Sequence, residues 1–206
     1  MLYDKDIREP LFEFLEIEYG KIRIFEEKTM GRSRADVMMV TEDSIVGIEI
    51  KSDADTYARL ERQVKDYNKF FDYNIVTVGS SHAAHIAEHI PDWWGIITVE
   101  EVDGKADFYR LREMHENPKP DLKRQMPFLW RRELAHIQDI NGMAKYNEKS
   151  KRFVIDKIIE KVEPGLLKKQ MCAELLERDY STINQDIADF KKKRWGRNKI
   201  CTQRKR

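Results

Sequence analysis

Two short apolar runs separated by a polar turn constrain the fold of this chain more than any other feature. Residues 35–40 and 45–51 are rich in apolar and β-branched side chains, and the four residues between them (Thr-Glu-Asp-Ser) are turn formers. A two-residue turn at the centre of that stretch pairs Asp36 with Glu49. The pattern therefore predicts a β-hairpin in which these two carboxylates are cross-strand neighbours, with Cβ atoms roughly 4.5–5.5 Å apart.

The same hairpin brings a lysine to the carboxylates. Because side chains alternate along a strand, Glu49 and Lys51 share one face, and Asp36 joins them there. In a chain that is 36% charged, a Glu-x-Lys pair is commonly a solvated ion pair. The apolar neighbours favour a buried strand instead, where three charged groups are costly unless something binds to them. A hard divalent cation, Mg²⁺ or Mn²⁺, suits such a site because magnesium prefers oxygen ligands.

This arrangement resembles the PD-(D/E)XK nuclease superfamily, in which an Asp is followed, after a variable gap, by Glu-x-Lys. Ala35 stands where that pattern loosely keeps a Pro. Downstream, Gln63 and Tyr67 resemble the Gln-x-x-x-Tyr element of the RecB-type branch. Further stretches are similar to a family of bacterial and phage proteins assigned to this superfamily by sequence; they include Arg34, Ser52-Asp53, Asp55-Thr56, residues 91–96, residues 129–134 and residues 150–152. The similarity covers most of the chain and implies no particular substrate.

The resemblance implies a role for each residue of the pattern. Asp36 and Glu49 would be the metal ligands, and Lys51 would support the attacking water and the transition state, while Gln63 and Tyr67 would line the site. The superfamily usually adds an acidic residue before the Asp. We expect Glu27, at the end of a predicted strand, in that place; Glu13 is the alternative if the ligand comes from the first helix. Each of these two could equally be a solvated surface carboxylate.

Periodicity predicts the remaining elements. We expect a helix over 4–19, a strand over 21–27, the hairpin, a helix over 54–71, a strand over 75–78, a helix over 82–90, strands over 95–99 and 108–111, and helices after residue 121. The order of helix, three strands, helix and strand predicts an α/β fold with a mixed sheet. It is also the order of the superfamily's restriction-endonuclease-like αβββαβ core, here followed by a C-terminal α-helical region.

Charge is distributed unevenly along the 206 residues. Residues 1–115 carry 15 Lys and Arg against 24 Asp and Glu, and residues 116–206 carry 23 against 13. The change falls at the Pro-rich stretch 116–120, so we predict a nuclease-like domain over 1–115, a linker over 116–120, and a basic helical domain over 121–206 that ends in a disordered tail. An acidic metal-holding half joined to a basic half suits an enzyme that acts on a polyanion, although an ordinary solvated helical surface has a similar composition.

Several basic residues are candidates for nucleic-acid binding. Arg59 and Arg62 share the helix with Gln63 and are candidate phosphate contacts. The tail contains Lys191, Lys192, Lys193 and Arg194, which would bind phosphate through counterion release. Residues 163–195 could form a helix–turn–helix, with a generic helical pair as the other interpretation. His82, His85 and His89 share a helical face with a spacing that a transition metal could use, but surface histidines explain it as well.

The remaining expectations concern compartment and function. With two Cys and no Cys-x-x-Cys pair, and no segment of 18 consecutive apolar residues, the sequence favours a cytoplasmic protein without a membrane span. We expect a Mg²⁺- or Mn²⁺-dependent nuclease that cuts phosphodiester bonds, with DNA favoured over RNA as its partner. The alternative is a nuclease-fold accessory protein that binds nucleic acid without catalysis. The chain could act as a monomer or a homodimer.

Overall fold

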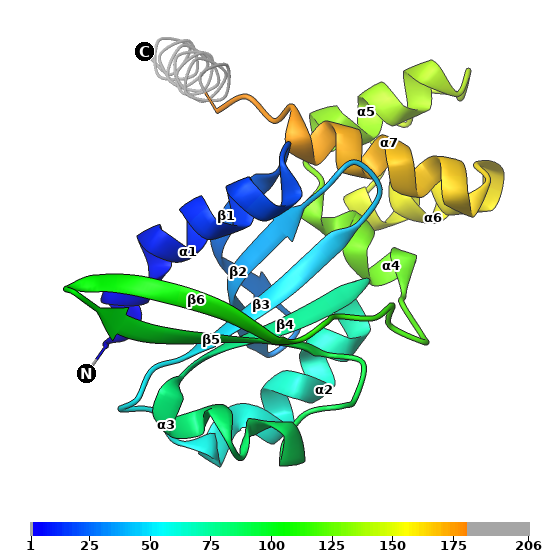
Figure 1. Cartoon of the computed structure of the whole chain (residues 1–206). Helices are drawn as coiled ribbons and strands as arrows, with labels where there is room; N and C mark the ends of the chain where they lie inside the picture. Colours follow the sequence, from blue (N-terminus) through cyan, green and yellow to red (C-terminus); the bar gives the residue numbers. More distant parts are fainter. Residues whose placement is uncertain (1, 181–206) are drawn as a thin grey trace, which may run out of the picture. The chain divides into compact units, whose positions relative to one another are not determined.

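The computed structural model describes residues 2–180 and is built around a six-stranded mixed sheet (Figure 1). The strands lie in chain order across the sheet: β1 (Arg23–Met30), β2 (Ser33–Val40), β3 (Ile45–Lys51), β4 (Tyr73–Gly79), β5 (Gly95–Val102) and β6 (Lys105–Arg112). Strands β1 to β3 are antiparallel, β3 to β5 are parallel, and β6 returns antiparallel to β5. The predicted α/β class with a mixed sheet is confirmed.

Helices and short turns connect and cover the strands. They are α1 (Asp4–Tyr19), η1 (Tyr57–Arg59), α2 (Leu60–Phe70), α3 (Ser80–Ala83), η2 (Ile86–Glu88), α4 (Leu122–Gln125), η3 (Met126–Phe128), α5 (Arg131–Ile140), α6 (Lys151–Lys161) and α7 (Pro164–Leu176). Within residues 2–180, no helix combines the length and the apolar character that a membrane span requires. The second half of the suggested helix–turn–helix and residues Lys191, Lys192, Lys193 and Arg194 lie outside the described part of the chain.

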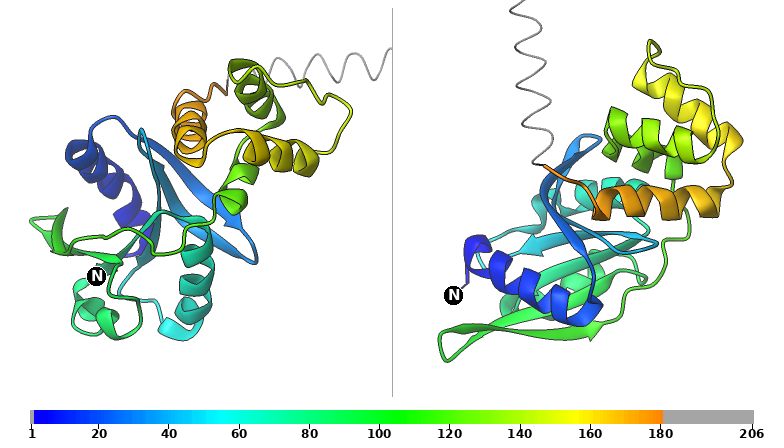
Figure 2. Two further views of the ribbon diagram at one scale, coloured as in Figure 1. Left: turned by 90° about the vertical axis from the view of Figure 1, so that its right-hand side faces the viewer. Right: turned by 90° about the horizontal axis from the view of Figure 1, so that it is seen from above.

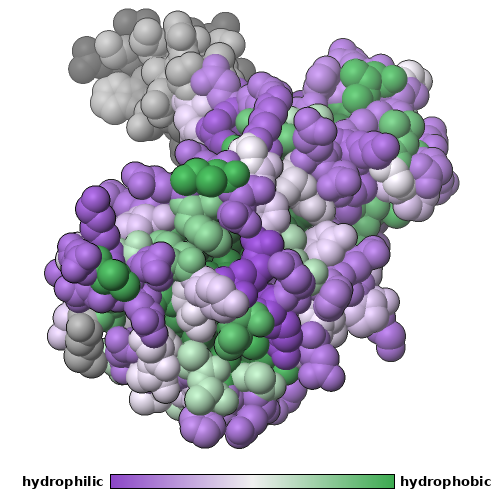
Figure 3. Space-filling model, in the orientation of Figure 1, coloured by the Kyte–Doolittle hydropathy of each residue, from purple (hydrophilic) through white to green (hydrophobic). Residues whose placement is uncertain are grey.

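The sheet has a hydrophobic core on each face. On one face, Ile7, Leu11 and Leu15 of α1 pack with inward residues of the central strands. On the other face, α2 and the helices after residue 121 share a larger core with the sheet. The left view of Figure 2 shows α1 and α2 on opposite sides of the strands. The outer surface seen in Figure 3 is mostly hydrophilic, with apolar side chains in smaller patches.

The predicted hairpin register is confirmed. Val37 pairs with Ile48 and Val40 with Ile45, and the turn closes through a hydrogen bond from the Thr41 N–H to the Ser44 carbonyl oxygen at 3.0 Å. Continued by one step, this register sets Asp36 opposite Glu49. The sequence periodicity of two therefore identified the face of the hairpin on which both carboxylates lie.

The prediction of one continuous helix over 82–90 is wrong. The chain forms two separate short helical turns there, α3 and η2. The chain bends here around the Tyr57 ring, whose centroid lies 5.0 Å from the His82 ring and 4.2 Å from the His89 ring. His85 instead lies near Glu88, at 3.4 Å. His82 and His89 thus contact Tyr57 while His85 contacts Glu88, and among residues 2–180 the three histidines form no metal-binding group.

The Pro-rich stretch predicted as a linker makes hydrogen bonds to the residues around the end of α2. Asn117 is buried, and its side-chain amide donates to the carbonyl oxygens of Asn68 at 2.9 Å and Phe71 at 2.7 Å. Its own N–H donates to the carbonyl oxygen of Asp72 at 2.7 Å. These bonds tie the stretch to the end of α2, so within the described residues it packs against the sheet domain.

A buried carboxylate joins the C-terminal helices to the sheet. Asp72 accepts hydrogen bonds from the Ile45 N–H at 2.7 Å and from the Gln125 amide at 2.9 Å. The Lys168 Nζ on α7 lies 2.7 Å from both carboxylate oxygens. A buried charge is tolerated only when it is paired and hydrogen-bonded, and Asp72 meets both conditions. The helices between residues 122 and 176 therefore share the hydrophobic core of the sheet.

Candidate active site

The hairpin and α2 form a polar cavity of about 370 Å³. Asp36, Glu49 and Lys51 reach it from β2 and β3, and Gln63 reaches it from α2. The four residues lie together because β2 and β3 pair in the predicted register and because α2 covers this face of the sheet. The cavity is also lined by Arg59, whereas Arg62 lies on the exposed side of α2.

Glu49 is the most enclosed member of the site, with 1% of its surface exposed. The Lys51 Nζ lies 2.7 Å from its Oε1, and the Gln63 amide donates to the same oxygen at 2.5 Å. The Tyr67 hydroxyl lies 2.8 Å from Oε2. These charged and neutral donors offset the cost of burying the carboxylate and hold it in one orientation.

Gln63 and Tyr67 act on Glu49 as a pair because residues four apart lie on one face of a helix. The Gln63 side chain also accepts a hydrogen bond from the Lys51 Nζ at 3.3 Å, so its amide group contacts both Glu49 and Lys51. Tyr67 is fully buried, and burial followed by the charges of Glu49 and Asp36 raises the pKa of its phenol well above the usual value. Tyr67 is therefore a neutral hydrogen-bond donor at ordinary pH.

Asp36 differs from Glu49 in its partners. Its Oδ2 accepts from the Ile50 N–H at 2.9 Å, and its own N–H lies 3.3 Å from the Tyr67 hydroxyl oxygen. Burial and the neighbouring charge of Glu49 raise the pKa of the Asp36 carboxyl to about 7, although the Ile50 hydrogen bond and the charges of Lys51 and Arg8 act to lower it. A partly buried carboxylate beside a buried one disfavours double ionisation, and Asp36 shows this effect.

Arg8 is a site residue for which the sequence contained no signal. From α1, its guanidinium donates to the Asp36 carbonyl oxygen at 3.3 Å and lies 3.8 Å from Asp36 Oδ1. It also pairs with Glu27 at 2.8 Å and with Asp4 at 2.6 Å. On a helical wheel, Arg8 is an ordinary polar residue with a partner four positions earlier. Only the packing of α1 against the sheet brings it to the cavity.

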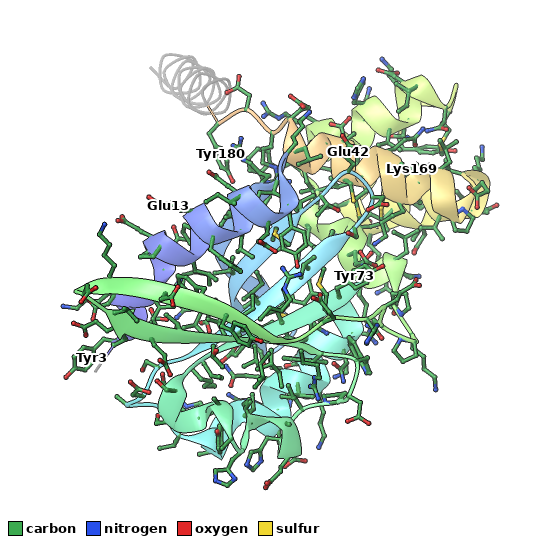
Figure 4. All side chains as sticks on the ribbon, in the orientation of Figure 1. Tyr3, Glu13, Glu42, Tyr73, Lys169 and Tyr180 are labelled. Atoms are coloured by element: carbon green, nitrogen blue, oxygen red, sulfur yellow. The ribbon has the colours of Figure 1, made fainter. Side chains whose placement is uncertain are left out.

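The two candidates for the additional acidic residue lie in different places. Glu27 lines the same cavity as Asp36, and it falls opposite Asp36 at a gap in the β1–β2 ladder, where its φ is 53°. A non-glycine residue in this region is uncommon, and such backbone strain clusters at functional sites. Its carboxylate is held by Arg8 and Arg34. Glu13, labelled in Figure 4, lies on α1 and lines a separate cavity with Glu101.

The donor set fits a magnesium-type cation. Over residues 2–180, no group of three or more His, Cys, Asp or Glu side chains has a metal-binding arrangement. Magnesium, however, is usually held by one or two protein carboxylates together with water and substrate phosphate. Asp36 and Glu49 supply two, and burial together with the neighbouring charge of Glu49 makes the ionised form of Asp36 unfavourable without a cation.

Comparisons with known proteins identify a family. The comparison with curated proteins gave no significant match. Among solved structures, the SfsA protein of Pyrococcus furiosus in complex with Ca²⁺ has 15% sequence identity and a TM-score of 0.33, over 50% of this chain and 59% of that chain. The chain thus spans less than two thirds of that protein, and a similarity this low does not establish a common fold. The family described as Bacteriophage P4 protein cII matches residues 2–202. Since this match spans nearly the whole sequence, the protein belongs to the bacteriophage P4 protein cII family.

Proposed function

We propose that this protein is a Mg²⁺- or Mn²⁺-dependent nuclease that hydrolyses phosphodiester bonds in DNA. The observation that carries the proposal is the convergence of Asp36, Glu49 and Lys51 in one polar cavity, with Gln63 and Tyr67 holding Glu49. An ion pair needed only for stability would not require a second carboxylate beside it. The proximity of Asp36, whose pKa is raised, is unfavourable for the protein alone and favourable in the presence of a cation.

The fold assignment that accompanies this proposal is the PD-(D/E)XK core. In its support, the chain runs through α1, then β1, β2 and β3, then α2 and the parallel strand β4. Apart from the short η1 turn, this order of helices and strands is the αβββαβ order that we predicted from the amino-acid sequence. The Asp and the Glu-x-Lys motif lie on adjacent strands of that unit, and the Gln-x-x-x-Tyr element lies on the helix that follows them.

Each side chain would have a distinct role. Asp36 and Glu49 would hold the cation, which when bound supplies a Lewis acid and a more acidic water. Lys51 carries a positive charge beside Glu49, where it can stabilise negative charge that develops on the phosphate in the transition state. Gln63 and Tyr67 orient Glu49, and Arg8 orients the backbone and carboxylate of Asp36.

A direct test is incubation of the purified protein with plasmid, linear and branched DNA in Mg²⁺ or Mn²⁺. We expect cleavage by the parent protein and none by Asp36→Asn or Glu49→Gln. Cleavage that persists at the same rate in both variants would assign the activity to a contaminant. Failure to cut any of the substrates, with cation binding to the parent shown independently, would overturn the proposal.

A second candidate function is a nucleic-acid-binding accessory protein without catalysis. It is favoured by the net charge of the second half of the chain, where 23 Lys and Arg face 13 Asp and Glu between residues 116 and 206. This candidate predicts that Asp36→Ala leaves DNA binding and all other activity unchanged, whereas removal of the basic tail abolishes binding. The nuclease proposal predicts that cleavage is lost in the first variant.

A further inference from the structure

A second cavity, of about 670 Å³, shares Glu27 with the candidate active site. One wall is the end of β1 with the β1–β2 turn, and the other is α4 with η3. We call it the β1–α4 groove, and define it by Glu27, Lys28, Phe70, Lys123, Arg124 and Phe128. Its volume falls within the roughly 300–1,000 Å³ of ligand sites in proteins.

The charge of the groove favours an anion. Lys28, Lys123 and Arg124 line it, and Glu27, the acidic residue of the defining set, is already paired with Arg8 and Arg34. Lys123 and Arg124 are paired with Asp156 and Asp121 at 2.6 and 2.9 Å, but the side chains of both pairs are about half exposed to solvent. Exposed ion pairs contribute little to stability, so a phosphate can replace the carboxylate as partner.

Aromatic rings form part of the groove as well. Phe70, at the end of α2, is half-buried, and its ring centroid lies 6.0 Å from that of the buried Phe128. The Lys28 Nζ lies 5.4 Å from the Phe128 centroid. A groove lined by cations and by the partly exposed ring of Phe70 has the combination that binds single-stranded nucleic acid, because the cations contact phosphates and the ring stacks on a base.

We infer that the β1–α4 groove binds an unpaired segment of the DNA substrate next to the bond that is cut. Glu27 lines both cavities, so a strand whose phosphate lies at Asp36 and Glu49 can continue past Glu27 into the groove. A base can stack on Phe70 only if it is free of its partner strand. The favoured substrate is therefore single-stranded DNA or a duplex with an unpaired end. This inference rests on the proposed nuclease function for the position of the scissile bond.

Binding is measured with the full chain by fluorescence anisotropy in EDTA, so that it does not depend on cleavage. The probes are labelled oligothymidylate, oligouridylate of equal length, and a blunt duplex. The variants are Lys123→Glu with Arg124→Glu, and Phe70→Leu, which removes the ring and keeps an apolar side chain. The matched control reverses two exposed charges on or beside the α1 side of the sheet, Lys5→Glu with Lys105→Glu. Melting temperatures establish that each variant is folded.

The charge reversal should weaken oligothymidylate binding and reduce the slope of log affinity against log salt by about 1.4, because each phosphate of a single strand that the protein neutralises adds about 0.7 to that slope. Phe70→Leu should weaken oligothymidylate binding by at least about fivefold, the lower range for removal of one stacked ring, and leave the duplex unchanged. The control should match the parent.

Other results would overturn the inference. Groove variants that bind oligothymidylate like the control would remove the groove from the DNA path, even if the protein cuts DNA. An equal loss on the duplex would contradict recognition of unpaired bases, and tighter groove-dependent binding of oligouridylate would contradict DNA as the substrate. If binding depends on the groove but no DNA is cut in Mg²⁺ or Mn²⁺, the nuclease proposal fails and the groove assignment stands.

Discussion

The Tyr67 hydroxyl lies 2.8 Å from Oε2 of Glu49, a carboxylate that is 99% removed from solvent. This hydrogen bond joins the helix that follows the hairpin to the strand that carries the acid. Hydrogen bonds to a charged group contribute more to stability than neutral ones, and an unsatisfied buried acceptor is expensive. The Tyr67 hydroxyl therefore contributes to the stability of the fold and, together with Lys51 and Gln63, to the orientation of Glu49.

Tyr67→Phe should lower both stability and cleavage. The free energy of unfolding should fall by about 1.5–3 kcal/mol, the usual range for loss of a hydrogen bond to a charged group. Cleavage should slow because Glu49 loses one of the donors that orient it. Urea unfolding and initial rates check both effects, with Tyr109→Phe on exposed β6 as the control. Unchanged stability would show that the hydroxyl contributes nothing to the buried carboxylate.

Neutralising the two acids should have opposite effects on stability. Asp36→Asn relieves repulsion and leaves an oxygen to accept from the Ile50 N–H, so the metal-free protein should be at least as stable as the parent. Glu49→Gln removes the partner of buried Lys51 and should destabilise it. Both should abolish cleavage. Thermal unfolding in EDTA measures the difference, and a large loss of stability in Asp36→Asn would mark Asp36 as structural.

The contribution of Asp36 to the stability of the metal-free protein should decrease as pH rises from about 4 to about 7. The pKa of Asp36 is about 7 in the folded state and near 3.8 as an ordinary Asp, so in this interval the folded state binds more protons than the unfolded state. Stability falls with pH wherever that holds, and the total change is on the order of a few kcal/mol. Urea unfolding in EDTA across this range should show that the stability of the parent falls relative to that of Asp36→Asn as pH rises. Equal slopes would argue against a raised pKa.

Cation affinity should increase as the Asp36 carboxyl loses its proton, whereas the contribution of Asp36 to stability decreases. A carboxylate must lose its proton to bind a metal, so Mg²⁺ or Mn²⁺ affinity should rise as pH passes through about 7. Calorimetric titration at several pH values measures this, and Glu13→Gln, which alters the separate cavity on α1, serves as the control. An affinity that does not change with pH would separate cation binding from Asp36.

Lys51→Ala should slow cleavage far more than it weakens DNA binding. A charge that acts on the transition state affects turnover, and removal of one such electrostatic interaction typically lowers the rate by roughly 10²–10³. Single-turnover rates and binding constants separate the two effects, with Lys105→Ala as a control away from the cavity. Weaker binding at an unchanged single-turnover rate would make Lys51 a phosphate anchor instead.

The local periodicities of the sequence determined a large part of the candidate site. The alternation along residues 35–51 set the hairpin register and the shared face of Asp36, Glu49 and Lys51. The four-residue spacing of Gln63 and Tyr67 set them on one face of a helix. These features depend on backbone geometry within an element or between strands joined by a tight turn. The hairpin register and the shared helix face can therefore be predicted from the sequence without knowing how distant elements pack.

Only the tertiary structure decided which distant side chains lie at the candidate site and which join the C-terminal helices to the sheet. Arg8 contacts the backbone of Asp36 from 28 residues away, and Lys168 reaches Asp72 across 96 residues. The choice between Glu27 and Glu13 likewise depended on the packing of α1 and on a strained residue in β1. Such contacts follow from the packing of whole faces against the sheet. No single residue pattern encodes that packing, because many polar residues on a helix surface have the same local signature and differ only in what lies across from them.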